Sequence, residues 1–318
     1  MLSVKDLSVQ FSVKSNQVKA VDRVSFDIPD NTVVGLVGES GSGKSVTALS
    51  LMRILPSNAN VVSGQVMWQG NDLLKLTEQE MREKRGKQIG LVFQNPMAAL
   101  NPVYTIGNQM IETLQLHFKL SRYEAKEKAI SLLKSVSIPD PEQRLNDYPH
   151  QFSIGMCQRI MIALTMSMKP KLLIADEPTA SLDVTIQAQV LALLKDLKSE
   201  THMSVLLISH DLGIIAQHCE YILVMYLGTI VEKGSVEDIF FRPKHPYTQA
   251  LMSSIPIPDP RKKQQPQLIA GDIPSPMAIP SGCRFHTRCP KVMDACKTQS
   301  PSWQKEGQQE VACLLYAD

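Results

Sequence analysis

Short, uninterrupted apolar runs recur along the chain, separated by longer segments in which apolar residues follow helical spacing. They occupy residues 33–37, 89–93, 172–175 and 204–208, and several are rich in β-branched side chains. A short continuous apolar run is typical of a strand buried on both faces of a parallel sheet. Because helix-like segments such as 160–168 lie between the runs, the pattern predicts an α/β fold with a doubly wound sheet.

The pattern changes character along the chain, which indicates more than one part. Residues 1 to about 93 contain mainly short β-type runs, whereas 94–156 show mainly helical spacing. Proline, glutamine and basic residues mark 256–267 as a linker, whose basic run 261–263 is most simply a solvated face. The sequence therefore predicts an inserted helical part and a separate C-terminal part.

One apolar run leads directly into a glycine-rich loop. Residues 33–37 are followed by GESGSGKS at 38–45 and then by the helix-like segment 48–55, which is GxxxxGK[ST] between a strand and a helix. The glycines let backbone N–H groups turn toward phosphate oxygens, and the helix N-terminus adds partial positive charge. Lys44 is expected to contact the β- and γ-phosphates and Ser45 to bind Mg²⁺. The segment predicts a binding loop for Mg·ATP.

Two adjacent acids follow another apolar run. Asp176 and Glu177 come directly after residues 172–175. Because parallel strands deliver their carboxyl ends to one edge of a sheet, both side chains are expected where a metal-bound phosphate could lie.

Composition narrows the class of protein. The 318 residues are 43% hydrophobic, enough for a large core, and carry a net charge of only +2, so no nucleic-acid partner is expected. No apolar run approaches the roughly eighteen residues that cross a bilayer, and the first residues alternate like a strand rather than a signal peptide. We expect a cytoplasmic protein that would need separate membrane subunits if it serves transport.

Further segments occur in an order that identifies a family. Gln94 follows the run 89–93, FSIGMCQR occupies 152–159, ASLD 180–183 and SHD 209–211. With the glycine-rich loop and the acids, these resemble the ATP-binding cassette (ABC) proteins. The resemblance implies a nucleotide-binding domain over 1–240 with a P-loop NTPase (RecA-like) core. It also implies an N-terminal antiparallel β subdomain and an inserted helical subdomain at about 95–156, which carries the signature loop and docks a membrane partner.

The resemblance also implies roles for individual residues. Glu177 is expected to orient and deprotonate the attacking water, with His210 and Gln94 as the other catalytic residues. Mg²⁺ is expected at Ser45, Gln94 and Asp176. Phe11 is a candidate to stack on adenine, although it is equally well a core residue. The full set of implied nucleotide contacts is Phe11, Gly38, Ser40, Gly41, Ser42, Gly43, Lys44, Ser45, Val46, Gln94, Ser153, Gly155, Met156 and Asp176.

A site of this family is completed by a second ATPase subunit, whose nucleotide the signature loop contacts. Ser153 and Gly155 would donate to the partner's γ-phosphate, but Ile154 stands where the family carries glycine. Either the loop tolerates the isoleucine, or its bulk and its exclusion from positive φ weaken the partner's site. A homologous partner with an intact signature loop, rather than an identical copy, is therefore favoured.

The C-terminal part narrows the subfamily. RPKHPYT at 242–248, NPMAALNP at 95–102 and DVTIQAQ at 183–189 resemble ATPases of dipeptide, oligopeptide and nickel importers. The resemblance implies a C-terminal extension over 241–318. It also implies an ATPase that powers peptide import at the inner face of a bacterial membrane, with two permeases and an extracytoplasmic binding protein. Import of nickel or another metal chelate is the alternative; a soluble ABC ATPase or a regulatory subunit is less well supported.

The extension also concentrates cysteine. Cys283, Cys289, Cys296 and Cys313 are four of the six cysteines, whereas Cys157 and Cys219 have the apolar surroundings of ordinary buried thiols. Four nearby thiolates suggest Zn²⁺ or an iron–sulfur cluster, although the spacing is not that of a CxxC zinc ribbon. In importers of this kind GCRFHTRCP resembles the segment associated with a [4Fe–4S] cluster. We expect that cluster, for which His286 could replace one ligand, with zinc or free thiols as alternatives.

Overall fold

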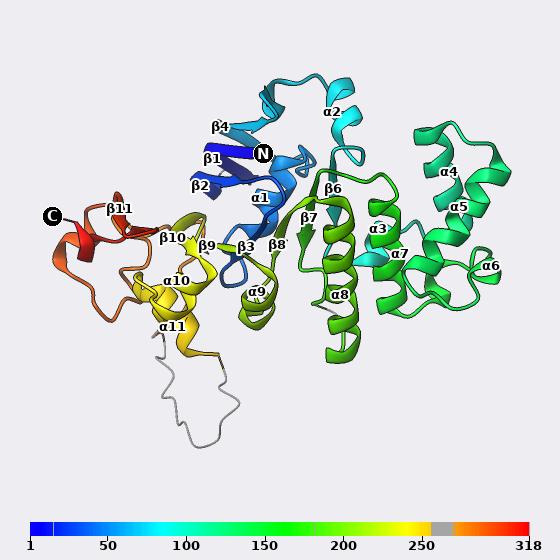
Figure 1. The fold of residues 1–318 in the computed structure, drawn as a ribbon. Helices are drawn as coiled ribbons and strands as arrows, with labels where there is room; N and C mark the ends of the chain where they lie inside the picture. The colour runs from blue at the N-terminus through cyan, green and yellow to red at the C-terminus, as the bar shows by residue number, and fades with distance from the viewer. Residues whose placement is uncertain (15, 181, 256–268, 270, 318) are drawn as a thin grey trace, which may run out of the picture. The chain divides into compact units, whose positions relative to one another are not determined.

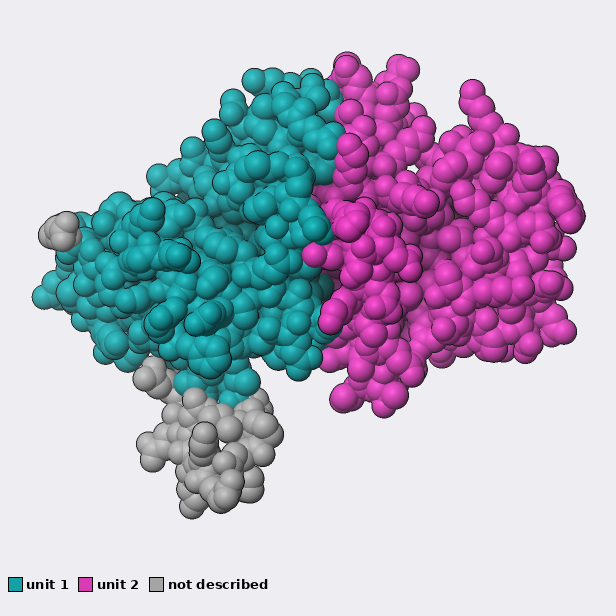
Figure 2. Space-filling model, in the orientation of Figure 1, with its two compact units in different colours: residues 1–76, 207–318 teal, residues 77–206 magenta. Residues whose placement is uncertain are grey.

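The structure is a computed structural model of the chain and describes residues 1–14, 16–180, 182–255, 269 and 271–317 (Figure 1). These form two compact units, coloured separately in Figure 2. Unit 1 combines Met1–Leu76 with Leu207–Asp318, and unit 2 is Thr77–Leu206. The predicted linker at 256–267, its basic run and Ser181 of the ASLD segment lie outside the described residues.

An antiparallel sheet opens unit 1. Its strands are β1 (Leu2–Val13), β2 (Asn16–Ile28), β4 (Ala59–Trp68) and β5 (Asn71–Asp72), in the order β2-β1-β4-β5. In β1, Leu2, Val4, Leu7 and Val9 are fully buried, as expected of a strand with one face on the core. The short turn η1 (Leu73–Lys75) follows. This sheet confirms the predicted N-terminal antiparallel β subdomain.

A second group of strands in unit 1 holds the glycine-rich loop. Strand β3 (Val33–Val37) is parallel to β9 (Tyr221–Tyr226), which pairs antiparallel with β10 (Thr229–Ser235). The extension adds β12 (Gln309–Ala312), which pairs with β10, and then β11 (Trp303–Glu306). The helices and turns of this part are α1 (Lys44–Leu51), α9 (Leu212–His218), α10 (Val236–Phe241), α11 (Pro246–Ser253), η3 (Asp294–Lys297) and η4 (Leu314–Tyr316). The extension thus continues the sheet that contains β3.

The described part of the extension is anchored by an aromatic cluster. The Phe285 ring is 1% exposed and lies 5.2 Å from the Tyr226 ring, 5.4 Å from Tyr247 and 5.7 Å from His245, measured between centroids. Tyr226 and Tyr247 are themselves fully buried. Aromatic pairs at these distances add stabilisation beyond the area that they bury. The cluster therefore packs this segment of the extension against β9.

Unit 2 pairs two parallel strands with a set of helices. Strand β6 (Ile89–Val92) runs parallel to β7 (Leu172–Asp176), and β8 (Ser204–Ile208) crosses from unit 2 into unit 1. The helices and turns are α2 (Glu78–Lys84), α3 (Pro96–Ala99), α4 (Ile106–Phe118), α5 (Arg122–Ser135), α6 (Pro141–Arg144), η2 (Pro149–Gln151), α7 (Ile154–Met166) and α8 (Val184–Thr201). The alternation of buried parallel strands and helices confirms the predicted α/β class.

The helical segment between β6 and α7 has its own core. Buried residues of α4 and α5, among them Met110, Leu114, Ala129 and Leu133, form one cluster with residues of α7. Helix α5 begins with a capping box, in which Ser121 accepts from the Glu124 N–H and Glu124 accepts from the Ser121 N–H at 2.8 Å. In the described part of the chain no helix is long and apolar enough to span a membrane.

We expect Phe285→Ala to lower the free energy of unfolding by about 3–5 kcal/mol, because the ring fills the space between Tyr226, Tyr247 and His245. Phe241→Ala is the matched control, because that ring is 80% exposed and its loss is expected to change stability by at most about 0.5 kcal/mol. Urea unfolding followed by tryptophan fluorescence measures both. Equal, small effects would contradict an aromatic anchor.

Candidate nucleotide-binding site

The glycine-rich loop joins β3 to α1 and packs its backbone against the turn between β9 and β10. A Cβ at Gly38 would lie 2.1 Å from the Met225 carbonyl oxygen, and Gly43 has a φ of 106°. The Gly228 N–H donates to the Ser42 carbonyl at 2.8 Å. Only glycine fits this close approach and this left-handed backbone. The loop has the strand–loop–helix context that the motif predicts.

Lys44 lies inside this loop. Its side chain is buried, and Nζ donates to the carbonyl oxygens of Gly38 at 2.8 Å and Glu39 at 3.0 Å. The Ser42 hydroxyl is also buried, yet no described residue offers it a hydrogen bond. A buried unpaired hydroxyl is costly, and a phosphate oxygen would satisfy it. The loop therefore fits the phosphates of a nucleotide.

The other predicted contacts of unit 1 lie on neighbouring elements. Ser45 and Val46 are half-buried in the first turn of α1, and Ser40 and Gly41 are exposed in the loop. Phe11 lies half-buried on β1, opposite Ala59 of β4. Its contact with adenine stays a prediction.

His210 follows β8 and precedes α9. His210 is exposed. The turn around it is fixed by two hydrogen bonds of Asp211: its N–H donates to the Ser209 hydroxyl at 2.9 Å, and its carboxylate accepts from the Gly213 N–H at 2.8 Å. Asp211 is therefore the N-cap of α9.

In unit 2, the acidic pair and Gln94 come together. Asp176 ends β7 and is buried, and Glu177 follows with a φ of 46°. The Gln94 Nε2 donates to the Glu177 carboxylate at 2.7 Å. A glutamate in the left-handed region is uncommon and costs conformational energy, which is typical of functional sites. The backbone thus turns at Glu177 so that its carboxylate meets the glutamine after β6.

The signature loop differs from one sequence-based expectation. Ser153 is the N-cap of α7, and Ile154 is its first residue, 47% exposed and outside the positive-φ region. Gly155 is the sterically restricted position, because a Cβ there would lie 2.7 Å from the Ile186 side chain. Because position 154 does not need positive φ, isoleucine causes no backbone strain there. Only the bulk of its side chain remains as a reason why the partner's ATP site would be weakened. Met156 donates its N–H to the Ser153 hydroxyl.

The cysteines give a mixed outcome. Cys157 and Cys219 are buried as predicted, and burial raises the pKa of their thiols to about 11 and about 12. Burial, with smaller contributions from the other three cysteines, raises the pKa of Cys283 to about 11. Among the described residues, however, no three His, Cys, Asp or Glu side chains are arranged to hold a metal ion. The arrangement therefore does not support the predicted [4Fe–4S] cluster, although its four thiols are the donors such a cluster takes.

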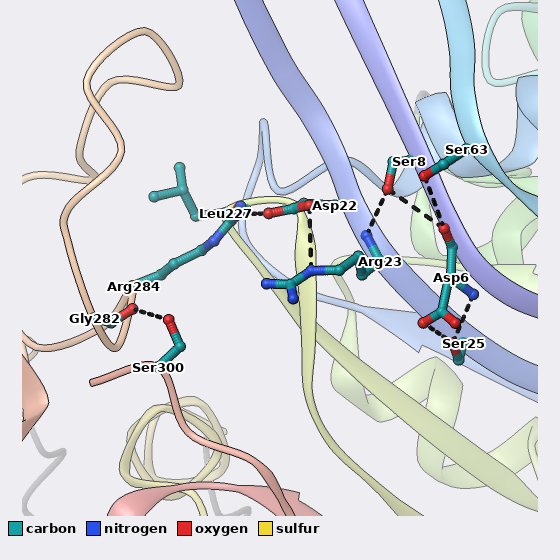
Figure 3. A network of polar contacts seen from close by, with 10 residues as sticks. All are labelled: Asp6, Ser8, Asp22, Arg23, Ser25, Ser63, Leu227, Gly282, Arg284 and Ser300. Carbon is teal, nitrogen blue, oxygen red and sulfur yellow. Dashed lines mark hydrogen bonds and ion pairs between the residues drawn. The ribbon is translucent and has the colours of Figure 1, made fainter. Parts of the chain in front are cut away.

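Sequence reasoning missed the residues of the extension that contact the loop. Tyr247 Oη accepts from the Glu39 N–H at 2.9 Å, and Arg288 Nη1 donates to the Glu39 carboxylate at 2.9 Å. Arg284 bonds the Leu227 carbonyl and Asp22 in the network of Figure 3. RPKHPYT and GCRFHTRCP indicated a subfamily and a metal site, but neither motif pointed to the nucleotide loop.

Comparison with known proteins assigns the family. The ABC transporter model matches residues 21–180, and the model of the oligopeptide/dipeptide transporter C-terminal region matches residues 231–296. The oligopeptide transport ATP-binding protein AppD of Bacillus subtilis is 45% identical, over 100% of this chain and 97% of its own. The dipeptide transport ATP-binding protein DppD of Escherichia coli is 43% identical, over 95% of this chain and 92% of its own.

A solved structure shares the fold. The dimeric ATP-binding cassette MJ0796 bound to ADP and Pi matches with a TM-score of 0.66 and 26% identity, covering 74% of this chain and 99% of its own. The chain therefore belongs to the ABC transporter family. It is an ATPase of that family, which uses ATP and Mg²⁺.

Proposed function

We propose that the chain is the ATP-hydrolysing subunit that powers import of di- or oligopeptides through a separate pair of membrane permeases. The observation that carries the proposal is that one chain matches both the ABC transporter model and the oligopeptide/dipeptide C-terminal region. Relatives that align along nearly their whole length are named as dipeptide and oligopeptide transport ATP-binding proteins. Residues 1–240 would be the nucleotide-binding domain, with the helical subdomain at about 95–156, and 241–318 the extension.

The residues of the two units would have separate tasks. In unit 1, the loop N–H groups and Lys44 would bind the β- and γ-phosphates, and His210 would contact the γ-phosphate. In unit 2, Glu177 would orient and deprotonate water, held in place by Gln94. Ser45, Gln94 and Asp176 would hold Mg²⁺, which when bound neutralises phosphate charge. The buried, unpaired Ser42 hydroxyl supports a phosphate at the loop.

The proposed partners rest on the family resemblance and on a groove of the helical segment. A second, homologous ATPase subunit would complete the site through Ser153 and Gly155, as a heterodimer. A shallow groove on the helical segment is lined by Tyr104, Asn108, Ile111, Glu112, Gln115, Leu116 and Arg122, with Tyr104 and Leu116 54% and 73% exposed. We assign this groove to a permease, which would hold the chain at the cytoplasmic face of the membrane. An extracytoplasmic binding protein would deliver the peptide.

We expect Glu177→Gln to retain Mg·ATP binding but to lose ATP turnover by about 10²–10⁴-fold, because the amide cannot accept the proton of the attacking water. Glu127→Gln on α5, which is exposed, is the matched control with unchanged turnover. The readouts are nucleotide binding to the full chain and ATP hydrolysis in proteoliposomes with both permeases and the partner ATPase. Normal turnover of Glu177→Gln would contradict the assignment.

The same proteoliposomes test the substrate. With the binding protein present, we expect a di- or tripeptide to stimulate ATP hydrolysis and to accumulate inside, because the peptide-loaded binding protein would engage the permeases. A nickel chelate serves as the control. Stimulation by the chelate and none by peptide would overturn the peptide assignment and leave the ATPase assignment intact.

For the extension, we propose that the four cysteines bind a [4Fe–4S] cluster in the loaded protein. The proposal rests on the chemistry of four thiols within one short segment and on its resemblance to the segment associated with such a cluster. The cluster would link strands of a segment too small for a large core. No catalytic step depends on it.

Anaerobic purification tests this proposal. We expect about four iron and four sulfide per chain and broad absorbance in the blue, because the four thiolates supply the complete ligand set of one cluster. Cys289→Ser is expected to lose most of the iron, whereas Cys219→Ser, at a buried thiol outside the extension segment, keeps it. Stoichiometric zinc, or neither metal, would show that the cluster assignment is wrong.

A further inference from the structure

Glu39, the second residue of the phosphate-binding loop, is held from two sides by the extension. Its N–H donates to Tyr247 Oη at 2.9 Å, and its carboxylate accepts from Arg288, with Nη1 at 2.9 Å and Nη2 at 3.4 Å. The Arg288 side chain is 8% exposed and that of Glu39 23%. This is a two-pronged guanidinium–carboxylate pair shielded from water, a far stronger arrangement than a surface ion pair.

The two contacting side chains are themselves fixed. Glu232, fully buried, accepts the N–H groups of Lys244 at 2.7 Å and His245 at 3.0 Å. His245 Nδ1 in turn accepts the Tyr247 N–H at 3.1 Å. The RPKHPYT motif therefore forms a rigid turn that presents the Tyr247 hydroxyl to the loop. The Phe285 ring packs on the Tyr247 ring. Phe285 lies three residues before Arg288 in the same turn, so it also anchors the backbone that carries Arg288.

A second connection reaches the other end of the loop. Arg284 donates to the Leu227 carbonyl and pairs with Asp22 (Figure 3). The Asp22 N–H donates to the Gly228 carbonyl at 2.8 Å, and the Gly228 N–H donates to Ser42 at 2.8 Å. Of the two arginines in the GCRFHTRCP segment, Arg288 therefore contacts the loop directly. Arg284 contacts the turn between β9 and β10, which in turn bonds the loop.

These contacts converge on Lys44. Its Nζ donates to the carbonyl oxygens of Gly38 and Glu39, the latter belonging to the residue that the extension holds. A shift of Glu39 would move one of the two acceptors that orient the lysine. Loss of Arg288 would also leave the Glu39 carboxylate without its counterion, near where polyanionic ATP would bind.

We infer that Arg288 and Tyr247 are positioning residues of the ATP site, through which the C-terminal extension holds and neutralises Glu39 and so sets the affinity for Mg·ATP. The inference rests on the proposed function of this loop. It gives the extension a direct role in nucleotide binding, besides any role in stability or partner choice. Neither residue touches the reacting atoms, so their loss affects binding more than the chemical step.

Mg·ATP affinity of the full chain, measured by calorimetry, tests the inference in two backgrounds. With Glu39 present, Arg288→Ala is expected to weaken binding about tenfold, which corresponds to about 1.4 kcal/mol. In a chain that carries Glu39→Gln, Arg288→Ala is expected to weaken Mg·ATP binding by less than about threefold, because residue 39, its direct partner, has lost its charge. Arg288→Lys is expected to recover part of the loss. In the assembled transporter KM is expected to rise while kcat changes less than about twofold.

Lys297→Ala is the matched control, because Lys297 pairs with Asp294 at the surface of the same extension and lies outside both motifs that contact the loop. We expect it to change affinity by less than about twofold. The inference would be overturned by an unchanged affinity in Arg288→Ala, by the same loss of affinity with and without Glu39→Gln, or by an equal loss in Lys297→Ala. If Arg288→Ala does not fold, Tyr247→Phe is the test, because it removes only the hydroxyl that accepts the Glu39 N–H. We then expect weaker Mg·ATP binding, and unchanged affinity would contradict the inference.

Failure of the proposed function gives a different result. If the unsubstituted chain binds no Mg·ATP, or Lys44→Ala binds it equally well, the ATP site itself is wrong. If the chain binds Mg·ATP and Lys44→Ala abolishes it while Arg288→Ala has no effect, only the role of the extension is wrong.

Discussion

The phosphate-binding loop packs its backbone directly against the turn between β9 and β10, and this close approach constrains the surrounding structure. Gly38 has no room for a Cβ beside the Met225 carbonyl, and Ser42 accepts a hydrogen bond from Gly228. The loop conformation is therefore not a property of residues 38–45 alone. Whatever holds the turn between β9 and β10 also holds the loop that would bind phosphate.

The extension holds that turn and the loop together. Arg284 bonds the Leu227 carbonyl in the turn, and Arg288 and Tyr247 bond Glu39 in the loop. Phe285 lies between the two arginines in sequence, and its buried ring fixes the backbone that carries both of them. In this chain, therefore, residues of the two motifs RPKHPYT and GCRFHTR contact the phosphate-binding loop and the turn beside it.

Local features were predictable from the sequence, and long-range ones were not. The strand before Gly38 and the acids after β7 follow from apolar runs next to polar residues, because both signals lie within a few neighbouring positions. Parallel strands β6 and β7 bring their carboxyl ends to one edge, so Gln94 and Glu177 were expected near one another; Gln94 was expected to bind Mg²⁺, and its hydrogen bond to Glu177 was not predicted. The Arg288–Glu39 pair joins residues 249 positions apart, and no periodicity encodes such a contact.

Two expectations show where residue type alone is insufficient. At the signature loop, the resemblance left open whether Ile154 is tolerated or weakens the partner's site; the backbone there is helical, and the tight contact is at Gly155. In the extension, four cysteines suggested a ready ligand set, but metal binding depends on how side chains are arranged, and among the described residues no three His, Cys, Asp or Glu side chains are so arranged. Both depend on backbone direction, which a motif does not specify.

Amide hydrogen exchange at Glu39 tests the central claim most directly, because its N–H bonds the extension through one hydroxyl. The measurement compares peptides spanning 38–45 from the unsubstituted full chain, Tyr247→Phe and the control Tyr123→Phe, at an exposed position of α5 outside both motifs. If the extension holds the loop, exchange at Glu39 becomes faster in Tyr247→Phe and stays unchanged in Tyr123→Phe. Identical exchange in all three proteins would contradict the claim.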